Sequence, residues 1–240
     1  MYKLEMHLHT LGRSPCALTD EHTIAQIYSG LHYDGIVCTN HFNRCLCDGH
    51  YPSGTETDKV NFWLGGYKTL KTECAAYGID VFLGMELLID DLTYYKPTPP
   101  HAEMLLYGID EQWLVAHPYD LFAMSLAELS ALCRQKGWLM SQAHPFRDGI
   151  NVQDPRLLEG GEIWNGHPQQ NNHNDQAADF VLKNNLLPTA GSDFHFPGCE
   201  GSGVYLENAV TTDRQLVAEL RRRKHKVFNK DGIIDFGKSK

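Results

Sequence analysis

Short apolar segments alternate with longer amphipathic segments along almost the whole chain, and this alternation is the strongest constraint on its fold. The apolar segments have the length of β-strands and the amphipathic ones have helical spacing. We predict strands at residues 2–9, 35–39, 81–85, 104–107, 138–141, 162–164, 187–190, 203–206 and 226–228. We predict helices from about residue 19 and over residues 59–77, 125–136, 175–183 and 212–223.

Strands that alternate with helices pair in parallel, because each crossover helix returns the chain to the same end of the sheet. About seven such units fit a closed or nearly closed α/β barrel better than two separate domains, although an open sheet has the same periodicity. The most linker-like segment, residues 95–100 (YKPTPP), is short and lies between apolar runs. We therefore expect it to be a loop within one domain.

Charge and cysteine content narrow the class of protein. The formal net charge is −9, which argues against a general nucleic-acid binder, because binding to phosphates needs clustered cations. The one basic run, residues 221–226, ends a predicted helix and suits its dipole. No apolar run has membrane-spanning length, and no signal-peptide pattern opens the sequence. Seven cysteines without such a signal fit reduced thiols, so we expect a cytoplasmic location.

Ionisable side chains occur at the ends of the predicted strands. His7 and His9 end the first strand, and side chains at i and i+2 point to the same face about 6.5–7 Å apart. Taken alone, this pair would also fit two half-exposed histidines on a surface strand. Other predicted strands end in further residues of the same kinds, namely His41, Glu86, His144, Asp193 and His195.

In a parallel barrel the carboxyl ends of all strands open on one face, so these seven side chains would line a single bowl. Imidazole and carboxylate donors together suit Zn²⁺, Mn²⁺ or Fe²⁺ better than Ca²⁺ or Mg²⁺. Seven donors are too many for one tetrahedral ion, so we expect at least two ions. Glu86 is the best candidate for a carboxylate that bridges them.

Five motifs in this order resemble the PHP-domain family (polymerase and histidinol phosphatase): HLHT at residues 7–10, TNH at 39–41, GME at 84–86, QAHP at 142–145 and GSDFH at 191–195. The resemblance spans about residues 1–210. It implies an α/β fold, a distorted (β/α)7 barrel with the metal site at the C-terminal ends of the strands, forming one domain over residues 1–240. It also implies a centre of two or three divalent transition-metal ions (Zn, Mn or Fe). The implied first ion binds His7, His9, Glu86 and Asp193, the second binds His41 and His195, and the third binds His144 with a share of Glu86.

The sequence departs from the family pattern at several positions. Glu5 and Asn40 stand where the family more often has Asp, at positions that orient ligands. Cys16 lies in SPC, which replaces the frequent Ser-Asp-Gly, so its thiolate could take the place of an Asp ligand of the second ion. His101 and Glu103 are both near the position of another family ligand, which leaves the third ion's ligand set open.

The implied activity is hydrolysis of phosphoester bonds in a small phosphorylated substrate by a metal-activated hydroxide. Glu86, His195 and Arg147 are the predicted catalytic residues, and Arg147 and Asn165 the predicted substrate-binding residues. His167 could protonate a leaving group or be an ordinary loop residue. Small monoesters, nucleotides and short oligonucleotides fit better than long nucleic acid, no membrane partner is expected, and the sequence sets no oligomeric state. Two alternatives stay open: a metal-dependent hydrolase of a non-phosphate bond, and a non-catalytic, metal-stabilised interaction module.

Overall fold

The structure, a computed structural model, describes residues 1–89 and 101–235. The segment that we predict to be a loop within one domain, residues 95–100, lies outside the described residues. The prediction of one domain over residues 1–240 therefore stays a prediction.

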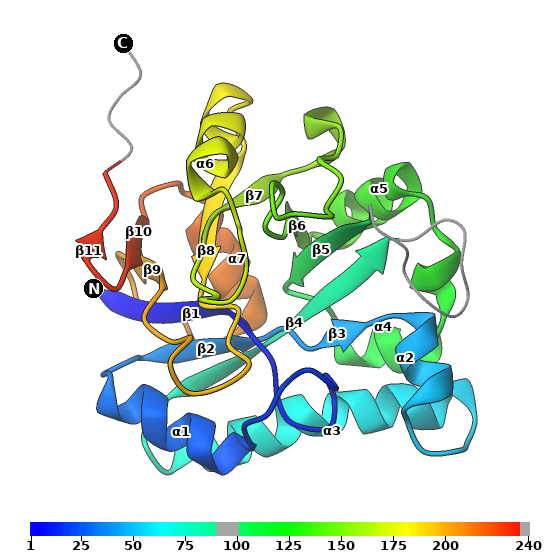
Figure 1. Cartoon of the computed structure of the whole chain (residues 1–240). Coiled ribbons are helices and arrows are strands. Elements are labelled where there is room, and N and C mark those ends of the chain that lie inside the picture. Colours follow the sequence, from blue (N-terminus) through cyan, green and yellow to red (C-terminus); the bar gives the residue numbers. More distant parts are fainter. Residues whose placement is uncertain (90–100, 236–240) are drawn as a thin grey trace.

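Eleven strands of the described residues form one strongly curled sheet (Figure 1). Their order along the sheet is β11-β10-β9-β1-β2-β4-β5-β6-β7-β8, and β3 pairs with β4 alone. The strands are β1 (Tyr2–Leu8), β2 (Gly35–Cys38), β3 (His41–Phe42), β4 (Asp80–Ile89), β5 (Ala102–Tyr107), β6 (Leu139–Gln142), β7 (Gly160–Asn165), β8 (Leu187–Gly191), β9 (Gly203–Leu206), β10 (Lys226–Asn229) and β11 (Gly232–Ile233). The seven strands from β1 to β8, leaving out β3, correspond to the seven that we predict for the barrel.

The β5 strand runs in the opposite direction to the other barrel strands. It pairs antiparallel with both β4 and β6, whereas β1, β2 and β4 pair in parallel and so do β6, β7 and β8. The expectation that every barrel strand presents its carboxyl end at one face is therefore wrong for β5. The start of β5, at Ala102 and Glu103, lies at the same rim as the carboxyl ends of its neighbours.

The barrel closes between its first and last strands through the segment that follows β8. Phe194 forms a parallel bridge with Leu8: its N–H donates to the carbonyl of His7 (3.1 Å), and its own carbonyl accepts from the N–H of His9 (2.9 Å). Gly191 lets β8 approach β1 this closely, because a Cβ at that position would lie 2.3 Å from the Cβ of His7. The first half of the same edge of β1 pairs with β9, and β10 and β11 follow, each strand antiparallel to the one before.

Helices cover the outside of the curled sheet, with α1 and α3 below the β1–β2–β4 side and α6 at the opposite side in Figure 1. The α-helices are α1 (Glu21–Gly30), α2 (Arg44–Gly49), α3 (Glu56–Ala75), α4 (Glu111–Ala116), α5 (Leu126–Lys136), α6 (Asn174–Lys183) and α7 (Asp213–Arg221), and two short 3-10 helices span Asp120–Ala123 and Pro155–Leu157. The short α2 and α4 are absent from our sequence prediction. Across the part of the chain that the structure describes, none of these helices has the length and apolarity needed to cross a bilayer.

Local sequence signals explain where several helices begin and end. Asp20 caps α1 by accepting from the N–H of Thr23 (2.9 Å), and Ser125 and Glu128 form a reciprocal capping box at the start of α5. Gly137 ends α5 with φ of +77°, a conformation that glycine adopts without strain. The predicted helix at residues 59–77 begins earlier, because Thr55 and Asp58 form another capping box, and it ends two residues earlier, at Ala75.

Candidate metal centre

His7 and His9 project into the barrel from the end of β1. Both side chains are fully buried, and their ring centroids are 5.1 Å apart. The two rings lie on the same face of an extended chain, as the HxH spacing predicts. The alternative interpretation of the pair as half-exposed surface histidines is wrong, because neither ring reaches solvent.

Two carboxylates meet these rings from the opposite strands. An oxygen of Glu86 lies 3.2 Å from His7 Nε2, and the other lies 3.3 Å from His9 Nε2. Asp193 Oδ1 lies 3.3 Å and 3.2 Å from the same two nitrogens. These four side chains, which the family resemblance implies as ligands of one ion, therefore converge within the barrel.

From the sequence we expected Glu86 to follow a strand, but it lies inside β4. The strand is longer than predicted because it continues past β2 and pairs with β3, where Glu86 faces His41. This placement puts the carboxylate at the middle of the cluster. Its Oε1 contacts His7 and His144 Nε2 (3.1 Å), while its Oε2 contacts His9 and His41 Nδ1 (2.7 Å).

A second group consists of His9, His41 and His195, whose ligand atoms lie within 4.8 Å of one another. The ring of His9 lies between the other two, with centroid distances of 4.3 Å to each. His195 follows β8 and His41 lies on β3, so this group spans the closure of the barrel. The backbone carbonyl of Asp193 accepts from His195 Nδ1 (2.9 Å), which leaves His195 Nε2 without a proton; the Cys16 sulfur lies 3.1 Å from it.

A third group consists of His41, Glu86 and Glu103, with His144 beside it. Glu103 Oε2 lies 3.5 Å from His144 Nε2, and the reversed direction of β5 brings it to the rim. His101 Nε2 is 3.9 Å from Glu103 Oε2 and belongs to none of the groups found among the described residues. Of the two residues that the sequence leaves open here, Glu103 is the one that the structure brings to the cluster.

Buried residues behind the cluster hold its histidines in one orientation. Glu162 accepts from His7 Nδ1 (3.0 Å), and Ser14 Oγ, which donates to Asn40, accepts from His9 Nδ1 (3.0 Å). Both bonds use the proton on Nδ1, so Nε2 is the nitrogen of each ring that faces the carboxylates. Glu5 accepts from the backbone N–H groups of His7 (3.0 Å) and Ser192 (2.8 Å) and so joins β1 to the end of β8.

Sequence reasoning missed Glu162. Its signal is a single acidic residue inside a short apolar strand, three residues before Asn165. Glu162 Oε2 accepts from the amide of Asn165 (2.9 Å) and from the backbone N–H of His144 (2.9 Å). The residue is 1% exposed, so its charge is balanced by these donors and by His7 and not by water.

The charged side chains of the cluster are buried, and their opposite charges shift one another's pKa values. Burial opposes protonation of His7, but Asp193 and Glu86 outweigh it and raise its pKa well above the ordinary value. Burial alone would raise the pKa of Asp193, yet His7 and Arg147 hold that pKa well below its ordinary value. Burial and His9 together lower the pKa of His195 to about 3, so His195 is neutral near pH 7.

The residues present fit divalent cations. His7 Nε2, His9 Nε2 and His144 Nδ1 are buried without a hydrogen-bond partner, although such atoms are normally satisfied. The first two of these atoms lie in the groups described above. Nitrogen and carboxylate oxygen together are the donors that Zn²⁺, Mn²⁺ and Fe²⁺ take. All seven predicted metal ligands therefore lie in one cluster whose unsatisfied atoms suit metal ions.

Arg147 and Asn165 lie next to the cluster and are bound to each other. Arg147 Nη2 donates to Asp193 (2.5 Å) and to Asn165 (3.0 Å), while its Nε donates to Asn172 (2.7 Å). Asn165 is 2% exposed and also donates to Glu162, so its amide is engaged within the protein. The geometry supports a positioning role for Asn165, and its predicted contact with substrate stays a prediction.

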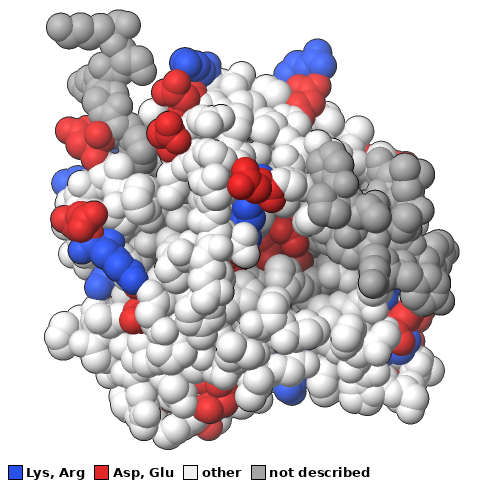
Figure 2. All heavy atoms as spheres, in the orientation of Figure 1, with Lys and Arg blue, Asp and Glu red and all other residues white. Residues whose placement is uncertain are grey.

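A pocket of about 360 Å³ opens onto the cluster. Among its lining residues are Cys16, His41, Arg147, His167 and His195. In Figure 2, acidic and basic side chains meet beside a hollow near the middle of the molecule. Over the described residues of that face, most Lys and Arg side chains lie next to acidic ones and form no continuous basic patch.

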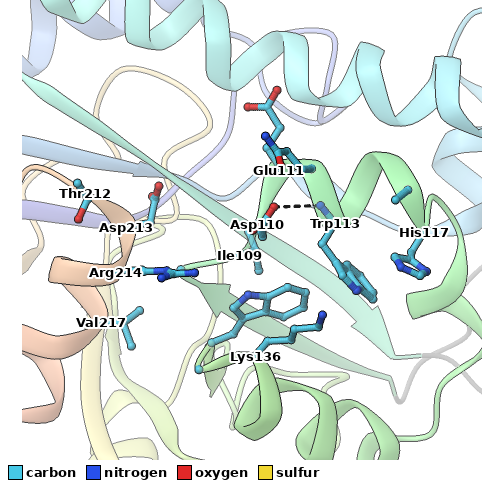
Figure 3. Close-up of a pocket in the computed structure, with 15 residues that line it drawn as sticks. Ile109, Asp110, Glu111, Trp113, His117, Lys136, Thr212, Asp213, Arg214 and Val217 are labelled. Carbon is cyan, nitrogen blue, oxygen red and sulfur yellow. Dashed lines mark hydrogen bonds between the residues drawn. The ribbon is translucent and has the colours of Figure 1, made fainter.

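A larger cavity, of about 740 Å³, lies at the other end of the barrel. It opens where β5 ends and β6 begins, between α4 and the start of α7, and Figure 3 shows Trp113, Lys136 and Arg214 around it. None of its residues belongs to a candidate metal-binding group of the described chain. Size alone would favour this cavity, but the clustered donors place the candidate functional site at the rim.

Comparisons with known proteins agree with this fold. A family model described as PHP-associated matches residues 171–225, and no curated protein sequence matches the chain. The fold is similar to that of a two-domain protein from Bacteroides vulgatus that contains a predicted PHP-like metal-dependent phosphoesterase, with a TM-score of 0.65 and 15% identity. The match covers 98% of this chain and 66% of that one, so the chain spans just under two thirds of the longer protein.

Two further solved structures are similar over nearly their whole length. A candidate metal-dependent phosphoesterase from Bifidobacterium adolescentis has a TM-score of 0.53 and 15% identity, covering 92% of this chain and 96% of that one. An amidohydrolase from Chromobacterium violaceum, with bound sulfate and no metal, has a TM-score of 0.56 and 16% identity, covering 95% and 98%. At these identities the likeness shows the fold.

Proposed function

We propose that this chain is a PHP-domain protein and a metal-dependent hydrolase that cleaves phosphoester bonds in a small phosphorylated substrate. The sequence motifs, the family model and the fold support this proposal. The single observation that carries the proposal is the convergence of imidazole and carboxylate donors from both ends of the chain, with buried atoms left unsatisfied, beside a solvent-open pocket. Two or three ions of Zn, Mn or Fe are part of the proposal. When bound, such ions supply Lewis acidity and lower the pKa of a coordinated water.

The protein's own residues have distinct tasks in this proposal. Glu86 lies between the donor groups with one oxygen toward His7 and His144 and the other toward His9 and His41, so its carboxylate would help to hold the ions of both groups. Arg147 lines the pocket while it donates to Asp193, so its guanidinium can neutralise phosphate charge next to the donors.

His167 is the residue best placed to carry a proton at the pocket. Its ring lies 5.2 Å from that of His195, and burial lowers its pKa, so it is neutral near pH 7. The backbone N–H of Gln169 donates to its Nδ1 (3.3 Å), which places the ring proton on Nε2. That Nε2–H is the group from which a departing oxygen would take a hydrogen bond or a proton.

The substrate class follows from the size and charge of the pocket. A volume of about 360 Å³ suits a small monoester or a nucleotide, since small-molecule sites begin at about 300 Å³. The acidic chain and the scattered cations disfavour long nucleic acid. A cytoplasmic location is a further part of the proposal, consistent with seven cysteines that form no disulfide.

Phosphate release tests this function. The purified chain is freed of metal by chelation, and aryl and nucleoside monophosphates are assayed after Zn²⁺ or Mn²⁺ is restored. We expect metal-dependent release that Glu86→Gln abolishes and that Glu159→Gln, the same change outside the cluster, leaves intact. No release from any phosphoester with metal bound would refute the proposal.

The amidohydrolase similarity supports a second candidate, hydrolysis of an amide or another non-phosphate bond at the same centre. A panel of small amides, assayed with the same metals and the same Glu86→Gln variant, separates the two. If metal removal lowers the melting temperature but neither panel shows turnover, the chain is a metal-stabilised interaction module.

A further inference from the structure

Two apolar side chains line the pocket that opens onto the metal cluster. They are Leu18, in the loop after β1, and Phe196, in the segment after β8. Leu18 is 70% exposed, and of the large hydrophobic side chains that the structure describes only that of Met1 is more exposed. A single leucine at a protein surface is ordinary, but this one shares a solvent-open pocket with a second apolar side chain. The pocket therefore has an apolar wall beside its wall of charged donors.

One peptide group holds both apolar residues in place. The carbonyl of His195 is part of the peptide bond that joins His195 to Phe196. It accepts from the N–H of Leu18 (2.8 Å) and from the hydroxyl of Thr19 (3.5 Å). Phe196 also packs against the hydrophobic core, and its own carbonyl accepts from the N–H of Cys199 (3.2 Å). Because His195 belongs to the metal cluster, the apolar wall has a fixed position next to the donors.

His167 is adjacent to both walls. Its ring lies 5.2 Å from that of His195 and 5.6 Å from that of Phe196, which it meets at 90°. In the proposed hydrolysis a bond from phosphorus to the oxygen of water forms and the bond to the ester oxygen breaks. The phosphoryl group lies at the donors and Arg147, and the ester oxygen that leaves lies at the Nε2–H of His167. The carbon attached to that oxygen then lies next to Phe196 and Leu18, so the apolar wall faces the leaving group.

We propose that Leu18 and Phe196 form a leaving-group subsite, and that the leaving group carries an aromatic ring directly on the ester oxygen or one carbon from it. The inference rests on the proposed function and names its substrate class. Aromatic rings pack with centroids about 4.5–7 Å apart and gain more than their buried area alone provides. Phe196 is next to His167, so a ring that packs on it has to be attached close to the departing oxygen. A nucleotide holds its base a whole sugar away from that oxygen, so compact aromatic phosphates are the better fit.

Two esters whose alcohols have similar acidity test this subsite. The ratio of kcat/KM for benzyl phosphate to that for ethyl phosphate, measured on the metal-loaded full-length protein, reports contacts made by the leaving group. We expect the ratio to favour benzyl phosphate and to fall about 2- to 12-fold in Phe196→Leu, which keeps an apolar side chain but removes the ring. Leu18→Ala should lower the ratio too, whereas Leu182→Ala, at an exposed leucine of α6 outside the pocket, should keep it. Leu18 is exposed, so its replacement disturbs no packed core, and circular dichroism confirms that each variant is folded.

Calorimetry gives a second measurement that does not depend on turnover. The metal-loaded protein is titrated with phenylphosphonate and with methylphosphonate, which have no ester bond to cleave. We expect phenylphosphonate to bind more tightly, and Phe196→Leu and Leu18→Ala to reduce the difference. Equal kcat/KM for the two esters, equal affinity for the two phosphonates, or a ratio that neither variant changes would each overturn this inference and leave the proposed function standing. No turnover of any phosphoester would overturn both.

Discussion

Replacement of Glu162 by Gln tests whether the buried carboxylate behind the histidines tunes the metal centre. Glu162 Oε1 accepts from His7 Nδ1, and its Oε2 accepts from the His144 backbone N–H and from the Asn165 amide. Glutamine has nearly the same shape, but it has no charge and only one oxygen. Whichever way its amide lies, at least one of these buried donors loses its acceptor.

The size of the effect follows from these contacts. Loss of a residue that orients a metal ligand typically lowers metal affinity about 10- to 100-fold, or about 1.4–2.7 kcal/mol. A buried donor left without an acceptor costs about 1–3 kcal/mol in the free energy of unfolding. We therefore expect Glu162→Gln to bind Zn²⁺ about 10- to 100-fold more weakly and to unfold at lower urea concentration.

The assay is a competition for Zn²⁺ between the metal-free protein and a chromophoric chelator, with urea unfolding measured alongside. Glu159→Gln is the matched control, because Glu159 pairs with Arg221 at the surface (2.6 Å) and lies three residues from Glu162. The control is expected to keep its zinc affinity. A Glu162→Gln protein that is folded and binds zinc as tightly as the wild type would refute the reasoning.

Three further outcomes follow from the structure. Chelation should lower the melting temperature, since an ion present at about 100 times its Kd stabilises the folded state by about 2.7 kcal/mol; a calorimetric scan that chelator leaves unchanged would contradict this. Gly191→Ala should lower the free energy of unfolding by about 1–3 kcal/mol, because the new methyl overlaps His7, and urea unfolding equal to wild type would argue against the tight β1–β8 contact. Burial lowers the pKa of His225, whose Nε2 donates to the carbonyl of Pro188. Below about pH 6.5 the unfolded chain takes up a proton at this residue and the folded chain does not, so the free energy of unfolding falls as the pH is lowered. His225→Gln should reduce the difference in urea unfolding between about pH 7.5 and about pH 5.5.

The sequence was sufficient for the parts of the centre that depend on local geometry. The spacing of His7 and His9 requires both rings to face one side of a strand, and they do. The order of strands and helices was sufficient to predict a barrel of seven strands, and the motifs resemble a family whose associated model matches residues 171–225. The prediction that His144, Asp193 and His195 follow strands at one rim is also confirmed in the positions that the structure gives them.

The direction of β5 and the roles of residues around it could not be predicted in this way. Periodicity measures which residues face inward, but it is the same for a parallel and an antiparallel strand. Glu103 therefore had no firm place until the pairing of β5 with β4 and β6 was known. The extension of β4 through Glu86 escaped prediction for a related reason, since its second half pairs with the two-residue β3, which has no sequence signal of its own.

The closure of the barrel at Phe194 also sets the order in which the centre can form. Phe194 lies between Asp193 and His195, and its pairing with β1 is what brings both donors to His7 and His9. A growing chain leaves the ribosome from its N-terminus, so the histidines of β1 emerge long before the residues that complete their group. Completion of the donor set is therefore a late event, tied to the docking of the final barrel strand, and a nascent chain stopped before residue 193 would carry an incomplete set of donors.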